Sequence, residues 1–267
     1  MVTTWLIYLG VGACAGLLAG LLGVGGGIII VPMLVFVFSY QHLPSPYIQH
    51  LALGTSLATI MFTSLSSLRA HHTHKAVNWQ VFTRIAPGII AGTLFGSWIA
   101  AQLSTRFLKG FFIIFTYYVA TQMLLNIKPK PNRLLPGPTG MTAVGGGIGV
   151  VSSLVGIGGG SMSVPFLIWC NISMHNAIGT SAAIGFPIAL AGTIGYVVNG
   201  LSVNDLPPQT LGFIYLPALF GIAVASFGTA PLGARLAHRI PVPKLKKIFA
   251  LLLFSIGTKM LFGLLAG

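Results

Sequence analysis

Long apolar runs, separated by short polar or basic stretches, follow one another along the whole chain. Runs of about 18 or more apolar residues with almost no charge are typical of membrane-spanning helices. The pattern predicts apolar segments at 5–22, 28–40, 47–68, 82–103, 108–126, 139–155, 161–172, 177–198, 210–232 and 246–265. We therefore expect an all-α integral membrane protein with about 8–10 transmembrane segments.

Two of these segments, 28–40 and 161–172, are too short to cross a membrane alone. A helix of about 12 or 13 residues covers about 20 Å, whereas the hydrocarbon core is about 30 Å thick. Each short segment follows a run of glycines, GVGGG at 23–27 and GIGGG at 156–160, and each contains a proline. We expect broken or re-entrant helices at both places.

Three motifs occur in the same order in both halves of the chain. The matching pairs are GVGGGIIIVPML (23–34) with GIGGGSMSVPFL (156–167), HLALGTSLA (50–58) with HNAIGTSAA (175–183), and LKGFFIIFTYYVATQML (108–124) with LKKIFALLLFSIGTKML (245–261). Three matches in one order indicate an internal duplication rather than chance similarity of apolar sequence. The predicted organisation is a first transmembrane repeat at 1–126, a cytoplasmic linker at 127–138 and a second transmembrane repeat at 139–267.

The distribution of charge predicts how the two repeats are oriented. The loops 69–84, 127–138 and 235–247 carry basic residues, whereas the counterpart of the first, 199–209, carries none and holds the only acidic residue, Asp205. Cytoplasmic loops of membrane proteins are enriched in Lys and Arg. The three basic loops are therefore expected in the cytoplasm and the acidic one outside, so the same element faces opposite sides in the two halves. This is an inverted-topology repeat with both termini external.

Composition narrows the classes of function. The chain has 55% hydrophobic residues, 6% charged residues and a formal net charge of +13. Because the basic residues lie in short loops between apolar segments, this charge indicates membrane orientation rather than nucleic-acid binding. The near absence of acids argues against the carboxylate relays of many proton pumps and against a path for divalent cations. No histidine or acid is placed to activate Ser161 or Ser163, so we expect no enzyme. The histidines of RAHHTHK (69–75) lie in a basic loop without acids and are expected to be solvated, so we expect no metal site and no cofactor.

The glycine runs are themselves candidate binding elements. Non-helical backbone at membrane depth occurs where it is buried in protein or lines a cavity. A helix that begins there presents free N–H groups and a partial positive charge, which together favour an anion. We expect an anion site lined by Gly25, Gly26, Gly27, Gly158, Gly159, Gly160 and Ser161. The alternative role of glycine, close helix packing, is expected for two GxxxG series, Gly12/Gly16/Gly20 and Gly88/Gly92/Gly96.

Hydroxyl groups and histidines are further candidates for contact with the anion. The motif GTS lies near the start of the third long segment of each half, and its hydroxyl residues are Thr55, Ser56, Thr180 and Ser181. These hydroxyls could donate to an anion or bond back to their own helix. His50 and His175 are candidate proton or substrate contacts, with a merely interfacial position near a helix end as the alternative.

The sequence resembles the TauE/SafE sulfite exporter family across nearly its whole length. The twice-occurring GxGGGxxxVPxL, with GTS downstream, carries the resemblance. It implies a multi-pass transporter in the bacterial cytoplasmic membrane that exports sulfite, sulfoacetate or a related organosulfonate. It also implies that the glycines and GTS hydroxyls named above form the site. Sulfite could carry its own proton, so a coupled proton is a candidate second partner.

The predicted mechanism is alternating access, in which two inverted halves rock about an anion site near the middle of the bilayer. An anion channel of the same fold is one alternative. A non-transporting membrane assembly or sensor protein is another, although the longest polar loops run only about fifteen residues and leave no room for a regulatory domain. The expected partners are the small anion and membrane lipid, with no nucleic acid, and an oligomer is left open.

Overall fold

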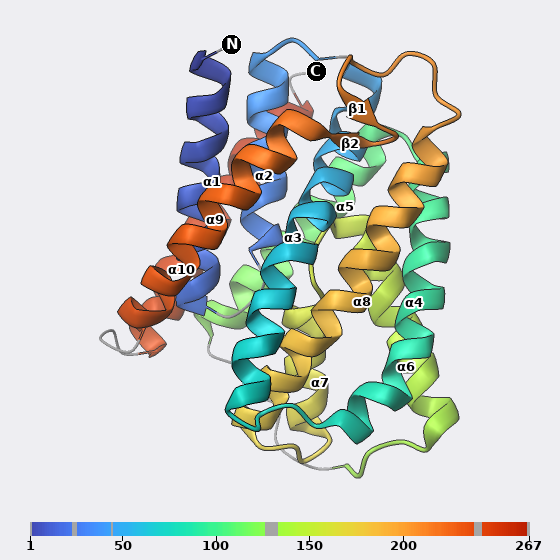
Figure 1. Ribbon diagram of the computed structural model, residues 1–267, viewed down its shortest axis with the longest axis vertical. Coiled ribbons are helices and arrows are strands. Elements are labelled where there is room, and N and C mark those ends of the chain that lie inside the picture. Colours follow the sequence, from blue (N-terminus) through green and yellow to red (C-terminus); the bar gives the residue numbers. More distant parts are fainter. Residues whose placement is uncertain (1, 23–25, 44, 126–132, 238–241, 266–267) are drawn as a thin grey trace.

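The computed structural model describes residues 2–22, 26–43, 45–125, 133–237 and 242–265 (Figure 1). The first half contains α1 (Val2–Leu22), α2 (Gly27–Tyr40), the short 3₁₀ helix η1 (Ser45–Tyr47), α3 (Ile48–Thr73), α4 (Trp79–Gln102) and α5 (Thr105–Leu124). The second half contains α6 (Pro138–Val155), α7 (Gly160–Trp169), α8 (Met174–Gly200), β1 (Thr210–Leu211), β2 (Ile214–Tyr215), α9 (Leu216–Ala237) and α10 (Val242–Leu265). The predicted all-α integral membrane architecture is confirmed in its main part.

Six helices are long and apolar enough to cross a membrane within the described part of the chain: α3, α4, α5, α6, α8 and the Lys246–Leu265 stretch of α10. Both α2 and α7 are shorter apolar helices, as the sequence predicts. One predicted boundary is wrong, because the segment expected to be helical from 210 begins with the antiparallel hairpin of β1 and β2. Gly212, in the turn of that hairpin, has a φ of 55°, a left-handed conformation that favours glycine. The helix α9 therefore begins only at Leu216.

Two helical hairpins enter the molecule from opposite ends. In Figure 1, α1 runs from the upper end toward the interior and α2 returns to the upper end, whereas α6 rises from the lower end and α7 returns to it. The beginning of α1 and the end of α10 both lie at the upper end. Consequently the residues at which α2 and α7 begin, Gly27 and Gly160, lie in the interior of the molecule rather than at its ends.

The long helices pack across the two halves of the chain. The main pairs are α1 with α9, α4 with α6, α3 with α8, α4 with α8, and α5 with α10. Glycines permit two of these close approaches: a Cβ added at Gly12 would lie 2.7 Å from the carbonyl oxygen of Ile222, and one at Gly92 would overlap the backbone of Gly146. The predicted packing role is confirmed for Gly12, Gly16, Gly88, Gly92 and Gly96. The surroundings of Gly20 lie outside the described residues.

Candidate functional site

Each glycine run supplies the first residues of a short helix that begins inside the protein. Gly26 precedes α2 with a φ of 66°, and Gly159 precedes α7 with a φ of 74°. Gly156, which ends α6, has a φ of 72°. In this left-handed region a side chain adds steric strain, so the sharp turns explain why glycine occupies these positions. Gly25, also predicted for the site, lies outside the described residues.

The starts of the two short helices meet at the centre of the molecule. A Cβ added at Gly27 would lie 2.5 Å from the carbonyl oxygen of Gly156 and 3.0 Å from the Cα of Ile157. The two segments therefore pack in direct contact and leave no room for a side chain at Gly27. Ser56 of α3 donates its hydroxyl hydrogen to the same Gly156 oxygen at 2.8 Å. The structure thus brings both glycine runs and one GTS serine to one place, which we call the break centre.

Both short helices leave backbone N–H groups free at the break centre. The carbonyl oxygens of Gly26 and Gly159 each accept hydrogen bonds from the third and fourth residues of the helix that follows. The N–H groups of the first two residues of each helix have no acceptor among the described residues. Because a helix N-terminus carries a partial positive charge, these N–H groups can hold an anion.

Four serines lie around Gly159, and we refer to them as the serine cluster: Ser152 of α6, Ser161 and Ser163 of α7, and Ser181 of α8. The hydroxyl oxygens of Ser163 and Ser181 are 2.7 Å apart, and Ser163 also donates to the Gly159 carbonyl oxygen at 3.0 Å. The hydroxyls of Ser152 and Ser161 are buried and have no partner among the described residues. Leaving a buried hydroxyl unpaired costs about 1–3 kcal/mol. Two such groups at one helix N-terminus point to a ligand.

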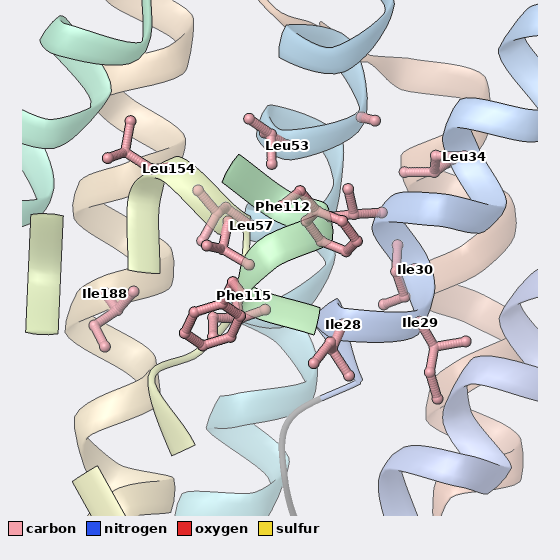
Figure 2. Packing of buried hydrophobic residues seen from close by; sticks show 14 of the residues in the cluster. Ile28, Ile29, Ile30, Leu34, Leu53, Leu57, Phe112, Phe115, Leu154 and Ile188 are labelled. Carbon is pink, nitrogen blue, oxygen red and sulfur yellow. The ribbon is translucent and has the colours of Figure 1, made fainter. Parts of the chain in front are cut away.

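Apolar side chains enclose the break centre. Figure 2 shows that this shell is built from several helices, with Ile28 of α2, Leu57 of α3, Leu154 of α6 and Ile188 of α8 among its buried members. No Lys, Arg, Asp or Glu side chain is buried in the part of the chain that the structure describes. An anion at this centre would therefore be stabilised by N–H and O–H dipoles, which act more strongly where water is excluded.

The threonines of the two GTS motifs bond to the opposite half of the chain. Thr55 Oγ1 accepts a hydrogen bond from the Tyr215 N–H at 3.0 Å, and Thr180 Oγ1 accepts one from the Asn78 N–H at 2.9 Å. Tyr215 directly precedes α9, and Asn78 directly precedes α4. We call these two bonds the threonine clamps, because each holds the start of a long helix of the other half. Neither bond is a return to the threonine's own helix.

The two candidate histidines lie in different surroundings. His50 is buried, with its Nε2 3.0 Å from the Ala100 carbonyl oxygen and 3.1 Å from that of Leu103. Because both partners can only accept, Nε2 carries the hydrogen and ties α3 to the C-terminal end of α4. His175 is exposed at the start of α8. No hydrogen bond joins either histidine to the serine cluster.

Two buried polar residues at or near this site do not stand out in the sequence. Ser152 lies one helical turn before Gly156, within an apolar run. Gln49 of α3 is fully buried, and neither its Oε1 nor its Nε2 has a partner among the described residues. Gln49 is two helical turns before Ser56 and therefore lies on the same face of α3. The signal that could have found both residues is a polar side chain at helical spacing from a motif residue.

The apolar helices and the buried centre define the class as a multi-pass membrane protein, and sequence comparison then gives the family. The profile of the family described as Sulfite exporter TauE/SafE matches residues 8–260. The chain therefore belongs to this family of membrane transporters. The described residues contain no group of three or more His, Cys, Asp or Glu side chains that could hold a metal ion.

Curated relatives extend over nearly the full length of the chain. A probable membrane transporter protein of Haemophilus influenzae is 39% identical over 262 residues, which cover 97% of this chain and 99% of the relative. The probable membrane transporter protein YunE of Bacillus subtilis is 27% identical, covering 97% of this chain and 98% of the relative. A probable membrane transporter protein of Methanocaldococcus jannaschii is 26% identical, covering 94% of this chain and 93% of the relative. No solved structure matches the chain.

Proposed function

We propose that this transporter exports a small sulfur-containing anion, such as sulfite, sulfoacetate or a related organosulfonate. The observation that carries the proposal is the pair of unpartnered hydroxyls, Ser152 and Ser161, beside the free N–H groups at the start of α7. All of these groups can donate hydrogen bonds, and an enclosed set of donors suits an oxyanion. The family description, which names sulfite, supports sulfur as the central atom.

The proposed binding residues combine the predicted positions with those that the structure adds. The backbone N–H groups come from the starts of α2 and α7, and the hydroxyls come from the serine cluster. The proposed residues are Gly26, Gly27, Gly158, Gly159, Gly160, Ser152, Ser161, Ser163 and Ser181. Ser56 supports the site through its hydrogen bond to the Gly156 carbonyl oxygen. In this proposal Thr55 and Thr180 support the site through the threonine clamps.

We further propose that the two halves are inverted-topology repeats that rock about the break centre. Exchanging α1–α5 for α6–α10 in order turns the pair α1 with α9 into α6 with α4, and leaves α3 with α8 and α5 with α10 unchanged. The threonine clamps are related by the same exchange. Such a relation supports alternating access, because each half can then take the place of the other.

The proposed orientation in a bacterial cytoplasmic membrane follows from charge. The connection from α3 to α4, which includes Lys75, and the segment that enters α6, which includes Arg133, lie at the lower end of Figure 1. Under the positive-inside rule this end faces the cytoplasm. The beginning of α1 and the end of α10, at the upper end, are then external.

Reconstitution of the purified protein into liposomes tests the proposed function. We expect saturable sulfite flux that shows counterflow, together with thermal stabilisation of the protein by sulfite. Flux without saturation or counterflow would indicate an anion channel instead. If sulfite, thiosulfate, sulfoacetate, sulfate and phosphate all produce no flux and no stabilisation, anion transport is contradicted. Repeating the flux with an imposed pH gradient tests proton coupling, which indifference to the gradient would rule out.

A further inference from the structure

A second polar site lies at the upper end of the molecule, away from the break centre. A pocket of about 710 Å³ opens between the N-terminal ends of α3 and α5 and the C-terminal ends of α4 and α10. Its lining includes Tyr47, His50, Ser104, Arg106 and Lys109. The pocket therefore has two basic side chains on one short stretch of α5.

The two cations of this pocket have no partner within the described chain. Arg106 is exposed and Lys109 is half-buried, and neither forms an ion pair or a side-chain hydrogen bond with another described residue. The chain contains a single acidic side chain, Asp205, which lies in the connection after α8 and does not line the pocket. Two adjacent positive charges without a counter-charge repel each other, so their position in one pocket favours a negatively charged ligand.

The polar groups around these cations can donate to that ligand. The Ser104 oxygen accepts from the Phe107 N–H at 3.2 Å, which leaves the Ser104 hydroxyl hydrogen free. The first N–H groups of α5 have no partner in their own helix. The Nε2–H of His50 is not free for a ligand, because it is already bonded to two carbonyl oxygens. The free donors thus lie together on the α5 side of the pocket.

We propose that this pocket binds an oxyanion group through Arg106 and Lys109. A guanidinium and an ammonium on one helix match the spread charge of a tetrahedral or pyramidal oxyanion. Two sources can supply this group: the phosphate of an anionic lipid, or a free oxyanion in solution. The site is separate from the break centre, so the inference does not rest on the proposed function.

The test measures binding in the full-length purified protein carrying Ser152→Ala and Ser161→Ala, so that the break centre contributes little. The probes are sulfate, phosphate, sulfite and a short-chain phosphatidylglycerol, each titrated by calorimetry at low ionic strength. We expect at least one probe to bind, and Arg106→Gln with Lys109→Gln to weaken its binding at least about tenfold. The matched control, Lys75→Gln with Arg84→Gln, removes the same charge from the other end and should leave binding unchanged.

The arms of this experiment distinguish the sources of the oxyanion. Binding of the lipid alone assigns the site to a lipid phosphate, and binding of the free anions assigns it to a soluble oxyanion. If none of the probes binds, or if the Arg106/Lys109 double variant binds as tightly as its parent, the proposal is overturned. Should that variant fail to fold, Lys109→Gln alone must still weaken binding, while Arg106→Lys must retain most of it.

Discussion

The last two glycines of each run, Gly26 and Gly27 in one and Gly159 and Gly160 in the other, begin their helices in the same way but have different side chains around them. Gly26 and Gly159 both adopt a left-handed conformation, and each carbonyl oxygen accepts from the third and fourth residues of the next helix. Around the second break stand the serines 152, 161 and 163, whereas the corresponding residues of the first half are Ala19, Ile28 and Ile30. Backbone dipoles therefore come from both halves, but most of the hydroxyls come from one.

This difference predicts where the proposed anion would lie within the break centre. A symmetric pair of helix ends attracts charge equally from both sides, so the dipoles alone cannot favour one half. The hydroxyls favour the half that holds most of them, because each hydrogen bond to a charged group contributes about 1.5–3 kcal/mol. We infer that the anion sits nearer the start of α7 than the start of α2, and the predictions below test this asymmetry.

The largest effect is expected from a side chain at either left-handed glycine. Gly159→Val places a Cβ 2.5 Å from the Ile188 Cδ1 atom and 3.3 Å from the Ser152 oxygen, in a backbone conformation that valine rarely adopts. Gly26→Val has the same backbone conflict. Both variants should abolish sulfite flux in liposomes while remaining inserted in the membrane.

The control for these variants is Gly147→Val, because nothing lies within 4 Å of a Cβ added at that position of α6. Its flux should equal that of the parent protein. Normal flux in both the Gly26 and Gly159 variants would remove these glycines from the transport mechanism. Loss of flux in the Gly159 variant alone would mean that only the second break takes part in transport.

The second prediction removes the unpartnered hydroxyls. Ser152→Ala and Ser161→Ala should each weaken anion binding about 10- to 100-fold, the loss expected for one hydrogen bond to a charged group. Stability without the anion should stay the same or rise, because an unpaired buried hydroxyl is removed. Thermal shift across a sulfite titration measures both quantities at once.

A serine that is buried but already bonded serves as the control for this pair. Ser226 of α9 is buried and donates to the Ala223 carbonyl oxygen of its own helix. Ser226→Ala should leave sulfite binding unchanged. Equal binding by the parent protein and the Ser152 and Ser161 variants would show that the serine cluster does not hold the anion.

The sequence predicts the breaks well because their cause is local. Glycine and proline act on the backbone at their own positions, so GVGGG and GIGGG indicate chain breaks without knowledge of the rest of the fold. The lengths of α2 and α7 follow from the apolar runs for the same reason. The β1–β2 hairpin escaped prediction because its residues are as apolar as those of the helix that follows, although Gly212 and the preceding Pro207 and Pro208 are local signs of a turn.

The partners of the hydroxyls could not be predicted, because they depend on contacts between distant segments. Thr55 and Tyr215 are 160 residues apart, and nothing in the GTS motif shows that its threonine accepts from the start of another helix. Ser152 is ordinary in sequence, since serine is tolerated within apolar helices when it bonds to its own backbone. Only its missing partner in the folded structure marks it as a candidate.

The third prediction concerns the threonine clamps. Thr55→Val and Thr180→Val each leave a backbone N–H unpaired, at a cost of about 1–3 kcal/mol. The two losses in the free energy of unfolding should be similar, because the two clamps have similar geometry. Thr55→Ser and Thr180→Ser retain the acceptor oxygen and should restore most of the stability. Lost sulfite binding at unchanged stability would contradict the clamp and favour direct contact with the anion.

The smallest effects are expected at the serines of the two GTS motifs, which occupy corresponding positions in the two halves. Ser56 donates to the Gly156 carbonyl oxygen, whereas Ser181 lies beside Ser163 within the serine cluster. Ser56→Ala should therefore lower stability by about 1 kcal/mol and hardly change sulfite binding. Ser181→Ala should instead weaken sulfite binding about fivefold, because it removes the hydroxyl that bonds to Ser163 within the serine cluster. If both variants weaken sulfite binding by the same factor, the anion lies midway between the breaks. If neither variant weakens it, the serines of the GTS motifs do not contribute to binding.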